Sequence, residues 1–89
     1  MPPYSVILSK EAKRDLDHLP RHVQKRIVRW LDLLADDPRR TPSLRLEGHP
    51  GIRRIHAGKD YVILYTINSQ RVEVIVVAVA NRRDVYRRM

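Results

Sequence analysis

Basic side chains of the kinds that bind phosphate gather at two places in the second half of the sequence. Residues 52–57 have the composition of a β-strand, and alternation along a strand puts Arg54 and His56 on one face and Arg53 on the other. Arginine binds phosphate through two parallel N–H groups, and histidine changes its charge near neutral pH. A second group closes the chain: Arg82, Arg83, Tyr86, Arg87 and Arg88. Such a surface could hold a phosphate. Spacing alone, however, favours the alternative of a solvated basic face without chemistry.

Charge is the strongest feature of the composition. The chain has 89 residues, with 18 Lys and Arg against 10 Asp and Glu, which gives a net charge of +8. Fourteen of the 18 cations are arginine, and residues 38–89 carry +7 of the net charge while residues 1–37 carry +1. A field concentrated in one half of a small protein attracts anions to that half. We therefore expect a polyanionic partner.

Other kinds of site are disfavoured by the residues present. The sequence has no cysteine, which excludes disulfides, thiolate zinc sites and cysteine nucleophiles. His18 and His22 are four residues apart, but Pro20 interrupts the helix that would aim both rings at one metal ion. The three glycines form no phosphate-binding loop, and no serine lies in a nucleophile elbow. We expect neither a metal nor another cofactor.

No segment of the sequence is typical of a membrane span or a secretion signal. The longest apolar run, Val74–Ala80, has seven residues, whereas a membrane-spanning helix needs roughly 20. The first residues have no cationic lead before a leucine-rich stretch and no small-residue cleavage site. We expect a cytoplasmic protein without a membrane partner.

The apolar pattern predicts two helices followed by a β-meander. The predicted elements are a strand over 4–8, helices over 10–18 and 21–36, and strands over 52–57, 61–67 and 71–80. The second helix has one apolar stripe, formed by Val23, Ile27, Trp30, Leu31 and Leu34, so we expect Trp30 in the core. Residues 38–50 are predicted as a connector, and residues 82–89 as a tail too short for an element of its own.

These elements predict a small α+β fold. The last strand is apolar almost throughout, which indicates a central strand covered on both faces. We expect one domain over residues 1–89, of the order β-α-α-β-β-β, with two N-terminal helices packed on a mostly antiparallel four-stranded sheet.

Four stretches of the sequence resemble the RelE/ParE toxin superfamily of bacterial and archaeal toxin–antitoxin modules. They are Leu46-Glu47-Gly48, Arg54-Ile55-His56-Ala57-Gly58, Asp60-Tyr61-Val62-Ile63-Leu64-Tyr65 and the closing Asn81-Arg82-Arg83-Asp84-Val85-Tyr86-Arg87. The closing stretch is the most specific, because it is similar to an ending common in the RelE branch. The resemblance covers almost the whole chain and implies a single RelE-like toxin domain over residues 1–89.

The resemblance implies a toxin that cleaves messenger RNA on the ribosome and that a cognate antitoxin neutralises in a hetero-oligomeric complex. Cleavage by the ribose 2′-OH needs a proton acceptor, a proton donor and cations around the phosphate, without a metal. Carried over to this sequence, Arg54 and Arg82 would stabilise the transition state and His56 would transfer a proton. Tyr86 would stack on a base or position the 2′-OH. The further candidates for RNA binding are Arg53, Lys59, Arg83 and Arg45.

One departure from the RelE pattern keeps other functions open. Tyr61 is followed by Val62, where RelE toxins usually have a basic residue. Either Arg53, Lys59 or Arg83 compensates, or catalysis is weakened, or the target is another one. The alternatives are a ParE-like inhibitor of DNA gyrase without nuclease activity and a non-catalytic nucleic-acid-binding module. Retention of the four catalytic candidates favours the endoribonuclease.

Overall fold

A computed structural model describes residues 3–39, 44–46 and 48–85, and the elements below lie within them. The helices are α1 (Lys10–Asp17), α2 (Arg21–Asp36) and the short α3 (Arg82–Val85). The strands are β1 (Ser5–Leu8), β2 (Leu44–Leu46), β3 (His49–His56), β4 (Tyr61–Asn68) and β5 (Glu73–Asn81).

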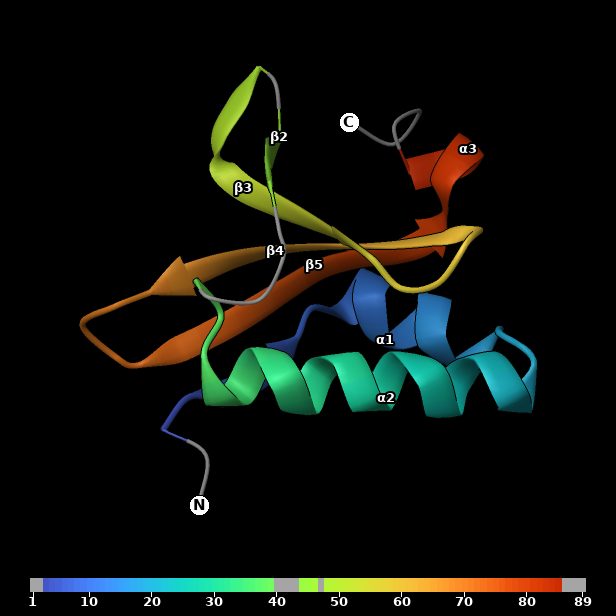
Figure 1. Cartoon of the computed structure of the whole chain (residues 1–89), viewed down its shortest axis with the longest axis horizontal. Helices are drawn as coiled ribbons and strands as arrows, with labels where there is room; N and C mark the ends of the chain where they lie inside the picture. Colours follow the sequence, from blue (N-terminus) through green and yellow to red (C-terminus); the bar gives the residue numbers. More distant parts are fainter. Residues whose placement is uncertain (1–2, 40–43, 47, 86–89) are drawn as a thin grey trace.

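The strands form one five-stranded sheet in the order β1-β5-β4-β3-β2. Strand β1 runs parallel to β5, and the pairings β5–β4, β4–β3 and β3–β2 are antiparallel. Helices α1 and α2 lie against one face of the sheet, and the β2–β3 hairpin and α3 stand on the other side (Figure 1). One face of the sheet is therefore covered by α1 and α2, and the β2–β3 hairpin and α3 lie at the edges of the other face.

Helix α1 is fixed to the central strand β5 by two side chains. The Ser9 hydroxyl accepts a hydrogen bond from the backbone N–H of Ala12 at 3.0 Å and donates one to the carbonyl oxygen of Val77 at 3.1 Å. A carboxylate oxygen of Asp15 accepts from the backbone N–H of Val79 at 3.1 Å. Strand β1 pairs only with the first part of β5, so Ser9, the N-cap of α1, and Asp15 satisfy backbone groups of β5 beyond the end of β1.

Helix α2 packs on the sheet through one apolar face. Its buried residues, Val23, Ile27, Leu31, Leu34 and Ala35, recur every three or four positions, as expected for a helix with one face in the core. The side-chain amide of Gln24 donates to the carbonyl oxygen of Leu16 at 2.8 Å and links the two helices. Trp30, predicted to lie in the core, is only partly buried and packs against the edge of the core.

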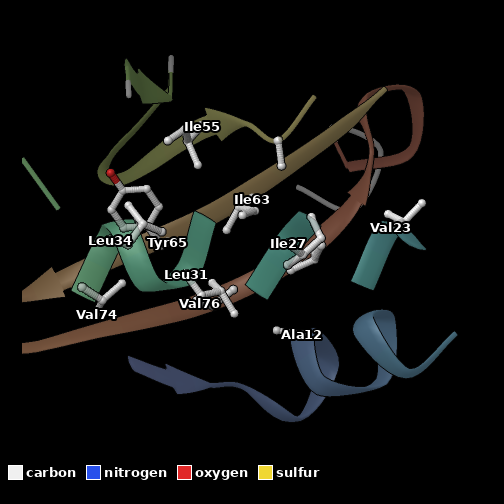
Figure 2. Packing of buried hydrophobic residues seen from close by; sticks show 12 residues of the cluster. Ala12, Val23, Ile27, Leu31, Leu34, Ile55, Ile63, Tyr65, Val74 and Val76 are labelled. Carbon is white, nitrogen blue, oxygen red and sulfur yellow. The ribbon is translucent and has the colours of Figure 1, made fainter. Parts of the chain in front are cut away.

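The main core fills the space between α2 and the sheet (Figure 2). Its largest fully buried side chain is Tyr65, whose hydroxyl donates a hydrogen bond of 2.8 Å to the carbonyl oxygen of Pro38. A second, smaller apolar cluster is built on Val62, Leu64 and Ala78, and Ile52, Val77 and Ala80 pack against it. Apolar residues lie on both sides of β4 and β5. The last strand is an interior strand, between β1 and β4, and its second face is covered in part, as expected for a strand with few polar residues.

The predicted fold class is confirmed, and four local predictions need correction. The sheet has a fifth strand, β2, inside the predicted connector, because the backbone of residues 44–46 pairs with β3, with Leu44 opposite Arg54, Arg45 opposite Arg53 and Leu46 opposite His49. Strand β3 begins at His49 rather than at Ile52, and β5 begins at Glu73 rather than at Arg71, which lies in the turn before it. The tail, predicted to form no element of its own, begins with a helical turn, α3. A hydrogen bond from the backbone of Arg82 to the turn between β3 and β4 holds this short helix in place.

Candidate functional site

The register of the sheet brings Arg54 and His56 together on the face opposite the helices. Arg54 lies directly across from Leu64, and His56 lies across from Val62. Directly opposed residues of an antiparallel pair share a face, and Leu64 and Val62 belong to the smaller apolar cluster. The two basic side chains therefore stand side by side at the rim of that cluster, as the alternation of β3 predicted.

The surroundings of Arg54 strengthen the attraction between its charge and an anion. Arg54 is half-buried and its Nε atom is fully buried, whereas His56 is exposed. Apolar side chains close to Arg54 include the fully buried Leu64 across the strand pair. A cation next to a low-dielectric surface attracts an anion more strongly than a cation surrounded by water. Arg54 is thus suited to hold a phosphate oxygen, with His56 reaching solvent beside it.

Arg53 does not join this group. It lies across from Tyr65, which belongs to the helix-side core, so its side chain leaves β3 on the helix side of the sheet. Val62 is fully buried opposite His56 and belongs to the smaller apolar cluster, so the position where the RelE resemblance leads one to expect a cation is apolar and buried here. Of the three residues considered as compensation for Val62, the geometry therefore disfavours Arg53 and leaves Lys59 and Arg83, which are both exposed.

The end of β5 is held beside the turn between β3 and β4. The backbone N–H of Arg82 donates a 2.8 Å hydrogen bond to the carbonyl oxygen of Asp60. The next N–H, that of Arg83, donates to the side-chain oxygen of Asn81 at 3.0 Å. Asp60, Asn81, Arg82 and Arg83 line one hollow. The side chains of Arg82 and Arg83 are exposed, so their charges border this hollow without an extensive desolvation penalty.

The turn itself is supported from the helix layer, a contact that the sequence did not reveal. Gly58 has φ +88°, a conformation that favours glycine. A Cβ added to Gly58 would lie 2.9 Å from Nη1 and 3.2 Å from Cδ of Arg26, so the Arg26 side chain of α2 lies against one side of this glycine. The only signal in the sequence was a glycine in a short turn, which carries no information about a residue 32 positions earlier.

Two predicted site residues stay outside this geometry. Tyr86 lies outside the described residues. Arg45 is on β2, where its backbone is opposite that of Arg53. Within residues 3–39, 44–46 and 48–85, no group of three or more His, Asp or Glu side chains is arranged to hold a metal ion. In the same part of the chain, no helix is long and apolar enough to cross a membrane.

The sequence matches a family of toxins over nearly its whole length. Residues 6–86 match the family described as "ParE toxin of type II toxin-antitoxin system, parDE". The chain therefore belongs to this ParE toxin family, within the RelE/ParE superfamily that its sequence motifs resemble. It is the toxin of a type II toxin–antitoxin module, a class in which a protein antitoxin is the partner.

Solved structures of related toxins share the fold. A chain of the RelBE2 toxin–antitoxin complex from Mycobacterium tuberculosis is 27% identical with a TM-score of 0.79, over 90% of this chain and 99% of that chain. A chain of the archaeal RelE–RelB complex from Pyrococcus horikoshii is 24% identical with a TM-score of 0.74, over 90% and 96%. The YoeB/ParE toxin from Agrobacterium tumefaciens is 10% identical with a TM-score of 0.77, over 88% and 98%. No protein with a curated description matches the sequence.

Proposed function

We propose that this toxin is a metal-independent endoribonuclease that cleaves messenger RNA on the ribosome and so inhibits translation. The observation that supports the proposal is the pairing of Arg54 and His56 on one face of β3, at the rim of an apolar cluster. A half-buried arginine beside an exposed histidine offers charge stabilisation and proton transfer within reach of one phosphodiester.

In the proposed reaction the ribose 2′-oxygen forms a bond to the adjacent phosphorus while the bond from phosphorus to the 5′-oxygen breaks. The 2′-OH loses its proton and the departing 5′-oxygen gains one, which leaves a 2′,3′-cyclic phosphate and a 5′-OH end. His56 would carry one of the two proton transfers, since it is exposed beside Arg54, which would hold the phosphate. Arg54 and Arg82 would stabilise the negative charge that develops on the phosphate oxygens.

The remaining candidates would hold the RNA rather than react with it. Lys59 and Arg83 are exposed near the proposed site and would contact phosphates on either side of the cut, which also offsets the lack of a cation at Val62. Arg53 would contact the RNA backbone away from this face, and Arg45 is a further candidate for RNA binding. Tyr86 would stack on a base or orient the 2′-OH.

The experiment maps the 5′ ends of a defined mRNA in a purified translation reaction, with and without ribosomes. The wild-type toxin is compared with Arg82→Ala and with Arg71→Ala, which removes an exposed arginine from the β4–β5 turn. We expect cuts within codons only when ribosomes are present, loss of the cuts in Arg82→Ala, and unchanged cuts in Arg71→Ala. The proposal would be contradicted if the wild-type toxin arrests the growth of cells but leaves the mRNA intact in this reaction.

The second candidate function is inhibition of DNA gyrase without nuclease activity. Two observations favour it: the matching family is named for ParE toxins, and Val62 stands where RelE toxins usually have a cation. The discriminating measurement is supercoiling by purified gyrase in the presence of the toxin. Inhibition together with accumulated DNA cleavage complexes, while the mRNA pool stays intact, would identify a gyrase inhibitor.

A further inference from the structure

The outer face of helix α2 carries a row of cations that the proposed catalytic site does not use. Arg21, Lys25 and Arg29 occupy every fourth position, so they form one stripe with a rise of about 6 Å from each residue to the next. Arg26 stands beside the stripe, and all four side chains are exposed. Residues 18–31 contain no Asp or Glu. We refer to these four cations as the α2 basic row.

The α2 basic row acts against the stability of its own helix. The N-terminus of a helix has partial positive charge and favours acidic residues, yet the first turn of α2 contains none and begins with Arg21. The last turn contains no basic residue and ends with Asp36. Arg21 and Lys25, and likewise Lys25 and Arg29, are like-charged pairs at a spacing of four, which also disfavours the helix. A charge pattern that local helix stability opposes indicates a binding role for the exposed face.

The α2 basic row reaches the proposed site through the turn between β3 and β4. Arg26 lies over Gly58, at the place where an added Cβ would come within 2.9 Å of Nη1. The turn dips towards the helix layer in Figure 1. His56 ends the strand before this turn, and the exposed Lys59 follows Gly58. Cationic groups therefore follow one another from the sheet face, across the turn, to the outer face of α2.

We infer that the α2 basic row binds the phosphate backbone of the RNA strand where that strand leaves the proposed site over the β3–β4 turn. The identity of the anion rests on the proposed function. A regularly spaced row suits a polymer with one anion in every unit, and three of its four cations are arginines, which bind phosphate through two N–H groups. Contacts of this kind are independent of base sequence and supply affinity rather than chemistry.

The test measures binding of a fluorescent 16-nucleotide 2′-O-methyl RNA strand by anisotropy, between 50 and 200 mM KCl. This strand has no free 2′-OH, so binding is measured without cleavage. The wild-type toxin is compared with the double variant Lys25→Gln/Arg29→Gln. The matched control is Lys10→Gln/Arg71→Gln, which removes the same charge from two exposed positions outside the α2 basic row.

Each lost phosphate contact lowers the slope of log Kd against log salt by about 0.7 for a single strand. We therefore expect the α2 double variant to lose about 1.4 from the slope and on the order of tenfold in affinity at 0.1 M salt. The control should keep most of the wild-type slope. Equal effects of the two double variants would overturn the inference, as would tighter binding of a DNA strand of the same sequence.

The result of this binding test can be distinguished from a failure of the proposed nuclease activity. A wild-type toxin that cuts no RNA, but whose α2 double variant shows the reduced slope, would refute the nuclease and keep the RNA-binding role of α2. If the α2 double variant binds RNA as the wild type does but no longer copurifies with the cognate antitoxin, the row serves a protein partner and the inference fails.

Discussion

The backbone N–H of Arg82 donates a 2.8 Å hydrogen bond to the carbonyl oxygen of Asp60, and this bond ties the end of β5 to the turn between β3 and β4. The bond uses the main chain of Arg82 and leaves its guanidinium exposed. Arg82 therefore joins the two segments through its backbone, and in the proposed site its side chain would offer its charge to a ligand. The two contributions can be separated by mutation.

Arg82→Ala and Arg82→Pro are expected to differ in stability although both remove the guanidinium. Alanine keeps the backbone N–H, whereas proline has none. Arg82 is the first residue of α3, a position where proline is otherwise tolerated. We expect Arg82→Ala to unfold at the same urea concentration as the wild type and Arg82→Pro to lose about 1 kcal/mol. Equal stability of the two variants would show that the Asp60 hydrogen bond contributes nothing measurable.

Gly58→Ala is expected to destabilise the toxin by about 1–2 kcal/mol in chemical unfolding. The φ of +88° disfavours any residue with a Cβ, and the new methyl group would also press on Arg26. The matched control is Gly51→Ala, because a Cβ at Gly51 meets nothing within 4 Å and its backbone needs no positive φ. Gly51→Ala should be neutral or slightly stabilising. A neutral Gly58→Ala would mean that the turn can adopt another conformation.

Much of the fold could be predicted because it depends on local patterns. The apolar stripe of α2 and the proline before it determine one helix and its start, and alternation along β3 correctly put Arg54 and His56 on a common face. Strand β2 could not be predicted, because its three residues form a strand only through pairing with β3. Patterns within a segment carry no information about such a partner.

The candidate site was predictable in its residue types and less so in its arrangement. The sequence could not show that Val62 is fully buried opposite His56, since burial depends on the elements that meet above the sheet. It also gave no sign that Arg26 supports the turn at Gly58, because this contact joins two segments through tertiary packing alone. Both features emerge only when β3, β4 and α2 are assembled.

Ser9→Ala is expected to lower the free energy of unfolding by about 1–2 kcal/mol. The alanine removes the cap of α1, where the hydroxyl accepts from the Ala12 N–H, and also the bond to the carbonyl oxygen of Val77. Ser9→Thr keeps a hydroxyl at the same place and should remain within about 0.5 kcal/mol of the wild type. Urea denaturation followed by circular dichroism measures both variants. A Ser9→Thr variant as unstable as Ser9→Ala would assign the effect to packing rather than to the hydroxyl.

Tyr65→Phe is expected to destabilise the core by about 1–2 kcal/mol without changing its shape. The Tyr65 side chain is fully buried, and its hydroxyl satisfies the carbonyl oxygen of Pro38 at 2.8 Å. The matched control is Tyr4→Phe, because the Tyr4 hydroxyl of the wild type accepts a hydrogen bond from the exposed Arg39. We expect Tyr4→Phe to change the stability by less than about 0.5 kcal/mol, because water can replace that partner. Thermal unfolding of the two variants gives the comparison, and equal melting temperatures would contradict it.

Arg21→Glu is expected to make the toxin more stable and a weaker binder of RNA at the same time. Glutamate complements the positive end of α2 and forms an attractive pair with Lys25 at a spacing of four, where arginine does neither. We expect the melting temperature to rise by on the order of 4 °C.

The affinity of Arg21→Glu for the 2′-O-methyl strand should fall, because one cation of the α2 basic row is replaced by an anion. Arg71→Glu, with the same change of charge outside any helix, should show neither the stabilisation nor an equal loss of binding. An Arg21→Glu variant of lowered stability would remove the argument that the α2 basic row is held against the preference of its own helix.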